Sequence, residues 1–190
     1  MKSENQSVKD LEKRFEFRTI REDEAGQAAQ IEQACFPPQE ACTEVMMRER
    51  ARKAPELFLV AVDRETGKLA GFLNGLSTDE HAFKDEFFQN AQLYCPQGEN
   101  IMLLGLAVLP QYRGQGLAGE LMARYIRRER NNGRKRLILT CLEEKIAMYE
   151  KMGFRNCGCL VPPGEEKIGM IWFVYYKKNG DPGQSFRFSM

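Results

Sequence analysis

The sequence has a single histidine, an almost balanced charge and no long apolar run. Its 190 residues include 28 basic and 27 acidic ones, which leaves a formal net charge of +1. This balance does not favour a polyanion-binding surface, and so we expect no nucleic-acid partner. The longest apolar run, Ile101 to Leu109, is much shorter than the ~20 residues that span a membrane. Its first residues resemble no secretory signal, and we expect a cytoplasmic protein without a membrane partner.

The cysteine pattern argues against the common structural zinc sites. Six cysteines are present, but none forms a Cys-x-x-Cys pair, and one histidine cannot complete a Cys/His site. We therefore expect no metal and six free thiols in a reducing compartment. Cys157-Gly158-Cys159 has the spacing of a redox or metal pair; alternatively, its two cysteines are small apolar fillers of a strand.

The length fits one domain that buries its own core. Residues 1–14 are polar and are predicted to be disordered, residues 15–177 to form the domain, and residues 178–190 to form a tail. Asp23 and Thr43 are placed to cap helices over 23–35 and 43–53. Apolar periodicity predicts the other elements. These are strands at 15–20, 57–62, 69–76, 101–109, 136–141, 154–161 and 170–177, and helices at 117–132 and 145–152.

The resulting order is β-α-α-β-β-β-α-β-α-β-β, which indicates an α/β fold with a mixed sheet and helices on both faces. The strands joined by the 117–132 helix should be parallel, because a helical crossover returns the chain in the same direction. The connection at 77–100, with a short helix around 82–90, is long enough to be typical of a functional or mobile segment.

A glycine-rich loop joins the most apolar strand to the next helix. It reads Arg113-Gly114-Gln115-Gly116-Leu117-Ala118-Gly119. Small residues let a ligand approach the backbone, and the first N–H groups of a helix have no partner within it. The loop therefore predicts a pyrophosphate site, with Arg113 as a cation beside it; a glycine turn without a ligand is the alternative. The remaining chain is too short for a Rossmann sheet, and no Gly-Lys-Ser/Thr completes a Walker A motif.

The helix that follows this loop is rich in basic residues. They predict either an edge that attracts anions near the loop or an ordinary solvated helix face. Between Leu117 and Arg136 the only acidic residues are Glu120 and Glu129. The same segment has seven basic residues: Arg124, Arg127, Arg128, Arg130, Arg134, Lys135 and Arg136.

Two motifs in register carry a family resemblance. Arg113-x-x-Gly116-x-Ala118, between a buried strand and a helix, resembles the acetyl-CoA signature of the GNAT superfamily of N-acyltransferases. Tyr149-x-x-x-Gly153-Phe154 resembles a second segment of the same superfamily. The stretch from Ile31 to Ala41 is similar to the N-terminal region of arylalkylamine N-acetyltransferases. Those enzymes often carry His on the central strand, where this chain has Met102 and Leu104.

The resemblance implies transfer of an acetyl group from acetyl-CoA to a small primary amine, by direct attack on the thioester. Protein N-terminal or lysine acetylation and a non-catalytic acyl-CoA sensor are the alternatives, and monomer and homodimer both stay open. Acetyl-CoA is the implied co-substrate. Its implied contacts are Leu106, Ala107, Val108, Arg113, Gly114, Gln115, Gly116, Leu117, Ala118 and Gly119.

Tyr149 is the candidate general acid for the departing thiolate, with an ordinary core tyrosine as the alternative. Phe36, Pro37 and Met47 are predicted to form an apolar floor for the amine or, alternatively, to pack between two short helices. No general base is assigned. The candidates are His81, Asp79, Glu80, Glu99 and a water relay.

Overall fold

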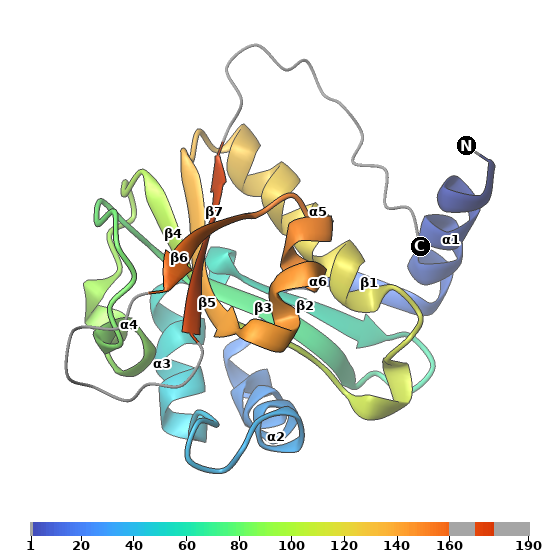
Figure 1. Cartoon of the computed structure of the whole chain (residues 1–190). Coiled ribbons are helices and arrows are strands. Elements are labelled where there is room, and N and C mark those ends of the chain that lie inside the picture. Colours follow the sequence, from blue (N-terminus) through green and yellow to red (C-terminus); the bar gives the residue numbers. More distant parts are fainter. Residues whose placement is uncertain (1, 160–169, 177–190) are drawn as a thin grey trace.

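The computed structural model of the protein describes residues 2–159 and 170–176 (Figure 1). Within these ranges the strands are β1 (Phe15–Thr19), β2 (Phe58–Asp63), β3 (Leu69–Thr78), β4 (Asn100–Val108), β5 (Arg136–Leu142), β6 (Arg155–Cys159) and β7 (Met170–Tyr176). They form one sheet in the order β1-β2-β3-β4-β5-β7-β6. β4 and β5 run parallel, and the other neighbours are antiparallel. The predicted mixed sheet and its parallel pair are confirmed.

Helices cover both faces of this sheet, as predicted. α2 (Ala25–Cys35) and α3 (Glu44–Lys53) share an apolar cluster with β2 and β3 on one face. α5 (Leu117–Asn131) and α6 (Ile146–Lys151) lie on the other face, over the larger cluster that contains β4 and β5 (Figure 1). Thr43 caps α3 as predicted, since its hydroxyl accepts the Met46 N–H at 3.3 Å.

The N-terminal residues differ from the prediction of disorder. Residues 2–14 form α1 (Lys2–Arg14), and Leu11 is buried in the larger core cluster. Glu12 pairs with Arg124 on α5, with 2.5 Å between Oε1 and Nη2. The sequence did not reveal this helix, because its anchoring contacts are with residues far along the chain. The predicted tail at 178–190 lies outside the described residues.

The connection between β3 and β4 is packed onto the domain. It contains α4 (Glu86–Gln89), much shorter than the helix predicted around 82–90. Phe83 and Phe87 are buried, and the Ser77 hydroxyl donates to the Cys95 carbonyl oxygen at 2.6 Å. The described cysteines are free thiols, namely Cys35, Cys42, Cys95, Cys141 and Cys157. None of the helices within the described ranges combines the length and apolarity needed to cross a membrane.

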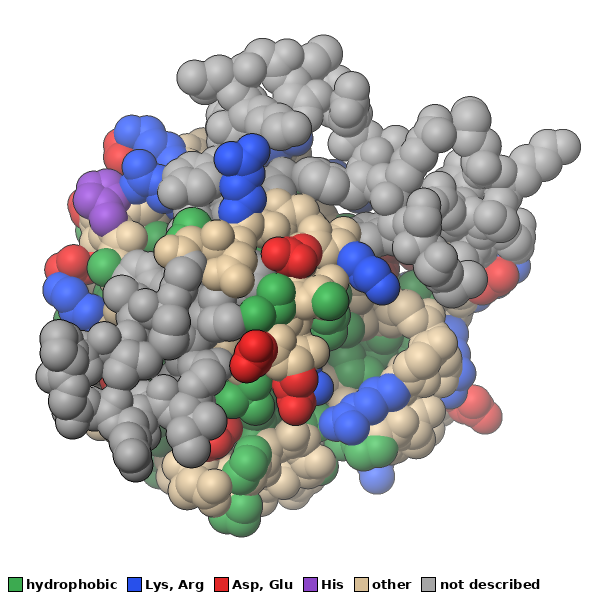
Figure 2. All heavy atoms as spheres, in the orientation of Figure 1, with side chains coloured by type: hydrophobic (Ala, Val, Ile, Leu, Met, Phe, Trp, Pro, Cys, Tyr) green, Lys and Arg blue, Asp and Glu red, His purple; other side chains and the backbone are tan. Residues whose placement is uncertain are grey.

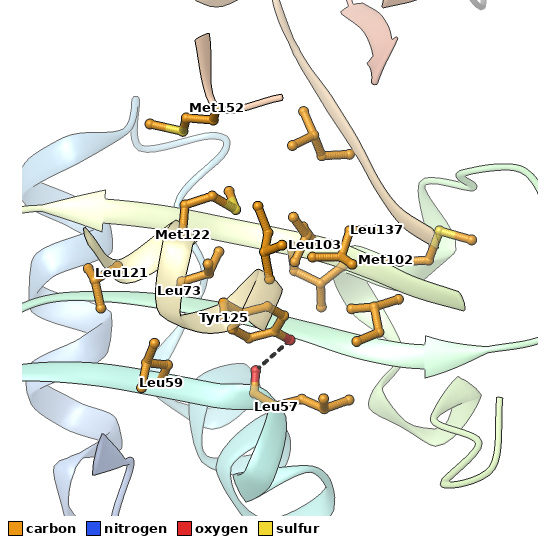
Figure 3. Close-up of a cluster of buried hydrophobic side chains, with 14 of the residues drawn as sticks. Leu57, Leu59, Leu73, Met102, Leu103, Leu121, Met122, Tyr125, Leu137 and Met152 are labelled. Atoms are coloured by element: carbon orange, nitrogen blue, oxygen red, sulfur yellow. Dashed lines mark hydrogen bonds between the residues drawn. The ribbon is translucent and has the colours of Figure 1, made fainter. Parts of the chain in front are cut away.

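Tyr125 of α5 lies in the middle of the larger core (Figure 3). Its side chain is 0% exposed, and its hydroxyl donates to the backbone oxygen of Leu57 at 3.1 Å. Burial raises the pKa of this phenol well above its usual value, so the hydroxyl stays protonated and able to donate. The bond thus ties α5 to the segment that enters β2.

We expect Tyr125→Phe to lower the free energy of unfolding by about 1–2 kcal/mol, because it leaves a buried carbonyl without its donor. Chemical denaturation measures this change. Tyr94→Phe is the control, since the Tyr94 hydroxyl donates to Glu56 at an exposed site and its loss should cost less than about 0.5 kcal/mol. Equal stability of Tyr125→Phe and the parent protein would contradict the assignment.

Candidate active site

The central strands β4 and β5 separate part-way along the sheet. They pair only from Asn100 to Met102 and from Arg136 to Ile138. On its other edge β4 carries a bulge, because Asn74 of β3 lies opposite Gly105 while the next residue, Gly75, lies opposite Leu103. Gly105 and Leu106, just beyond the bulge, are only half-buried, whereas the rest of β4 is buried. In the middle of the sheet, the facing edges of β4 and β5 are therefore unpaired, and two residues of β4 are partly exposed.

The glycine loop leads from the end of β4 into α5. Gly114 and Gly116 have φ angles of +73° and +83°, in the left-handed region that favours glycine. The Glu120 N–H bonds back to the Gly116 oxygen at 3.0 Å, so the preceding N–H groups at the start of α5 have no partner within the helix. A Cβ at Gly114 or Gly119 would meet no described atom within 4 Å. The predicted loop is therefore an open cradle of backbone donors.

Arg113 fixes the position of this loop. Its Nε donates to the Val108 oxygen at 3.0 Å, and its Nη2 lies 3.3 Å from the Cys35 sulfur. The side chain therefore links the loop to the end of β4 and to the last residue of α2. The predicted contact between Arg113 and phosphate stays a prediction.

Most of the predicted basic edge lies away from the loop. α5 has 15 residues, so its two ends are about 22 Å apart, and the loop precedes its first residue. Glu129 is buried near the far end, where Arg128 and Arg134 pair with it. Arg124, nearer the loop, lies between the carboxylates of Glu12 and Glu120. The expectation of an anion-attracting edge near the loop is wrong for these side chains.

Tyr149 lies in the last turn of α6, half-buried against the larger core. Its ring meets Phe154 edge-on, with 5.8 Å between the centroids. Leu106 of β4 and Ala118 of α5 are partly buried against the same cluster. Burial raises the pKa of the Tyr149 phenol far above its usual value, and nearby Cys141 adds to this shift. The hydroxyl thus carries a proton at neutral pH, as a general acid must.

A buried carboxylate lies on the other side of β4. Glu32 of α2 is 3% exposed, and its Oε2 has no hydrogen-bond partner within the described structure. A Cβ built on Gly105 would lie 3.6 Å from this oxygen and 3.4 Å from Oδ1 of Asn74. Both side chains therefore face Gly105, the residue that follows the β4 bulge.

Burial raises the pKa of Glu32, while the charge of Arg50 and a hydrogen bond from Cys42 act in the opposite direction. Burial also raises the pKa of Cys42 to about 11, so this neighbour remains a thiol. Asn74 Oδ1 and Arg50 Nη1 are likewise buried without a described partner. Such groups are rare in proteins, which indicates that a water or a polar ligand completes this cluster.

The sequence motifs do not include Glu32, which was not predicted as a functional residue. A signal was present, because Glu32 continues the three- and four-residue spacing of Ala25, Ala28 and Ala29, and therefore falls on the apolar face of α2. Asn74 gave no comparable signal, since it stands in a buried strand whose neighbours only the sheet register identifies.

The comparison with known families decides the classification. Residues 25–154 match the model of the acetyltransferase (GNAT) family. The chain belongs to this family. The superfamily inferred from the two motifs is therefore confirmed, whereas the match does not select the arylalkylamine subgroup.

Solved GNAT structures share the fold of this chain at low sequence identity. The loading GNATL domain of CurA from Lyngbya majuscula has 14% identity and a TM-score of 0.70, with 85% of this chain and 97% of that chain covered. The ribosomal-protein-S18-alanine N-acetyltransferase from Escherichia coli has 18% identity and a TM-score of 0.63, with coverages of 90% and 99%. Diaminobutyrate acetyltransferase EctA from Paenibacillus lautus has 13% identity and a TM-score of 0.62, with coverages of 89% and 98%. No curated protein matches.

The predicted amine-binding residues of this GNAT protein differ in exposure. Phe36 is half-buried and Pro37 exposed, directly after the end of α2. Met47 is 0% exposed and belongs to the core under α2 and α3. The Asn74 side-chain nitrogen lies 3.7 Å from the Met47 sulfur, so Met47 supports Asn74 from within the core. Contacts between the amine and Phe36 or Pro37 stay predictions.

His81 lies near the first residues of β4 and β5, whereas the glycine loop follows the last residue of β4. Its Nδ1 is in contact with Arg136 and lies 3.4 Å from the Asn100 side-chain nitrogen. Figure 2 shows it at the surface beside basic side chains. Asp79, Glu80 and Glu99 belong to the same region and bond to the Glu99 N–H, Lys84 and Lys135 respectively. In the described part, no cluster of three or more His, Cys, Asp or Glu is arranged to hold a metal.

We expect Gly114→Ala to weaken the binding of CoA, because its methyl group would project into the open side of the loop. Gly67→Ala is the matched control, since Gly67 also has a positive φ (+68°) and open space around it, but lies in the turn between β2 and β3. Each substitution should cost about 1 kcal/mol of stability for the left-handed conformation. Calorimetric titration with CoA distinguishes them, and equal dissociation constants would refute a ligand site at Gly114.

Proposed function

We propose that this protein is a cytoplasmic enzyme that transfers the acetyl group of acetyl-CoA to a small primary amine. The observation that carries the proposal is the opening at the β4 bulge. One side of it offers hydrogen-bond and proton donors, and the other side offers a proton acceptor. The glycine loop and Tyr149 belong to the α5 and α6 face, and the buried Glu32 carboxylate belongs to the α2 face. Family membership supports acetyl transfer in general, and the residues of this chain support the roles below.

Acetyl-CoA fits the first side of the opening. The N–H groups from Gly114 to Gly119 would hold its diphosphate, since a helix N-terminus favours negative charge. The edge of β4 at Leu106, Ala107 and Val108 lies beyond the pairing with β5, and its backbone groups would hold the arm that carries the thioester. An N–H of this edge would stabilise the oxyanion that forms during attack.

The amine must lose a proton before it can attack. An alkylamine with a pKa near 10.4 is neutral in only about one part in 10³ at pH 7. Glu32 is suited to accept this proton, directly or through a water held with Asn74, because burial raises the pKa of its carboxylate and so makes it a stronger base. The raised basicity and the unpartnered Oε2 beside Gly105 support this role.

The reaction then exchanges one bond for another. The amine nitrogen bonds to the thioester carbonyl carbon, and the carbon–sulfur bond breaks as the tetrahedral intermediate collapses. Glu32 would release to solvent the first proton that the amine loses, and the nitrogen would lose its second proton to solvent as the amide forms. Tyr149 would donate its phenolic proton to the departing thiolate and recover one from solvent, so the reaction releases one proton in total.

An aromatic or alkyl group on the amine is the substrate class we favour. Phe36 follows Glu32 by one helical turn, and its N–H donates to the Glu32 backbone oxygen at 2.9 Å. Together with Pro37 it offers an apolar surface next to the proposed base. Calorimetry with acetyl-CoA, followed by turnover of arylalkylamines, diamines and peptides, tests this class. Turnover of peptides alone would indicate a protein acetyltransferase, and binding without any turnover would indicate a sensor.

We expect Tyr149→Phe to lower kcat by about 10²-fold and to leave the KM for acetyl-CoA little changed, because it removes a proton donor while keeping the ring. Phe154→Leu is a control for packing, since Phe154 contacts the Tyr149 ring without offering a proton. Steady-state kinetics of the three proteins measures both constants. Equal kcat values for Tyr149→Phe and the parent protein would exclude Tyr149 as the acid.

We expect Glu32→Gln to lower kcat by about 10²-fold or more and to remove the acidic limb of the pH–rate profile. A base acts in its deprotonated form, and burial raises the Glu32 pKa, so kcat/KM should rise with pH through a value above the usual ~4.3 of a glutamate. Glu40→Gln, at an exposed position, should keep the parent profile. An unchanged acidic limb in Glu32→Gln would assign the proton transfer to another group.

A further inference from the structure

The helix α1 lies against the glycine loop, although it precedes the part of the chain that matches the GNAT family model. Figure 1 shows α1 beside the beginning of α5. The Leu11 side chain comes to 4.0 Å from the position that a Cβ of Gly116 would occupy, and Glu12 pairs with Arg124. Arg64, in the turn between β2 and β3, donates from Nε to the backbone oxygen of Glu12 at 3.2 Å. These contacts hold the last turn of α1 at the side of the loop.

Arg14, the last residue of α1, reaches the loop itself. Its Nη1 donates to Oε1 of Gln115, between the two left-handed glycines, at 2.8 Å. Its guanidinium carbon lies 5.2 Å from the ring centroids of both Phe15 and Tyr112. The Tyr112 hydroxyl in turn donates to Oδ2 of Asp63 at 2.8 Å, which fixes the ring. The cation is therefore held in place before any ligand binds.

The charge of Arg14 is available to an anion. Arg113 is directed to Val108 and Cys35, and Arg124 is shared by two carboxylates. Arg14, by contrast, forms no ion pair with the described side chains of residues 8–157, and its acceptor at Gln115 is a neutral amide. The open space at Gly114 and Gly119 shows that α1 borders the cradle without filling it.

We propose that α1 forms a side wall of the diphosphate cradle and that Arg14 binds the phosphate groups of the cofactor. This inference rests on the proposed binding of acetyl-CoA at the glycine loop. The planar guanidinium presents several N–H donors and is always charged, which suits a phosphate better than a neutral side chain does. The helix thereby adds to this chain a cofactor contact that lies outside the matched part of the family.

Calorimetric titration of the full chain with CoA tests this contact. We expect Arg14→Gln to raise the dissociation constant by about 10-fold and Arg14→Lys to raise it less, because lysine keeps the charge and loses the fork. Lys13→Gln is the matched control, since Lys13 is an exposed cation on the same helix that pairs with Asp10. It should bind CoA like the parent protein.

Acetyl-pantetheine, which lacks the diphosphate, separates phosphate binding from general damage. Turnover of this substrate should be the same in Arg14→Gln and in the parent protein. Equal losses with both thioesters, or a CoA dissociation constant unchanged by Arg14→Gln, would overturn the inference. If the parent protein itself fails to bind CoA, the proposed function is overturned together with the inference.

Discussion

The structure depends on the separation of β4 from β5. The two parallel strands begin as neighbours, but their pairing ends at Met102 and Ile138, just before β4 bulges at Leu104. Beyond that point their facing edges have no strand partner, although the other edges stay paired with β3 and β7. The same divergence exposes Gly105 and Leu106 in a strand that is otherwise buried. The groups that are proposed to act in catalysis or cofactor binding lie on the two faces of the sheet around this opening.

The two faces of the sheet contribute different kinds of group to the opening: one face offers hydrogen-bond donors and a cation, and the other a buried carboxylate. Backbone donors at the start of α5, with the Arg14 cation beside them, suit a bound anion. On the other face, burial disfavours the charged form of Glu32 and so makes its carboxylate a stronger base. The apolar clusters on both faces anchor the elements that carry these groups, and burial limits the access of water to Glu32. Under the proposed function, the amine and the phosphorylated cofactor would therefore approach β4 from opposite faces of the sheet.

The conformation of the glycine loop and the cap of α3 could be predicted from the sequence because their signals are local. Gly114 and Gly116 adopt conformations that favour glycine, and Thr43 caps its helix with a bond across three residues. Glu32 and Asn74 are remote from Gly105 in sequence, and only the pairing of β3 with β4 and the docking of α2 bring them together. The same holds for α1, whose few apolar residues did not predict a docked helix.

The sequence by itself determined the order of the strands and main helices that follow α1, the parallel pair, the glycine loop and the family. Such features follow from hydrophobic periodicity, turn chemistry and short motifs, which are complete within a few residues. Tertiary structure alone decided the burial of Glu32, the position of most basic residues away from the loop, and the placement of Arg14 beside Gln115. The physical reason is that charge and basicity depend on neighbours in space, and those neighbours lie far apart along the chain.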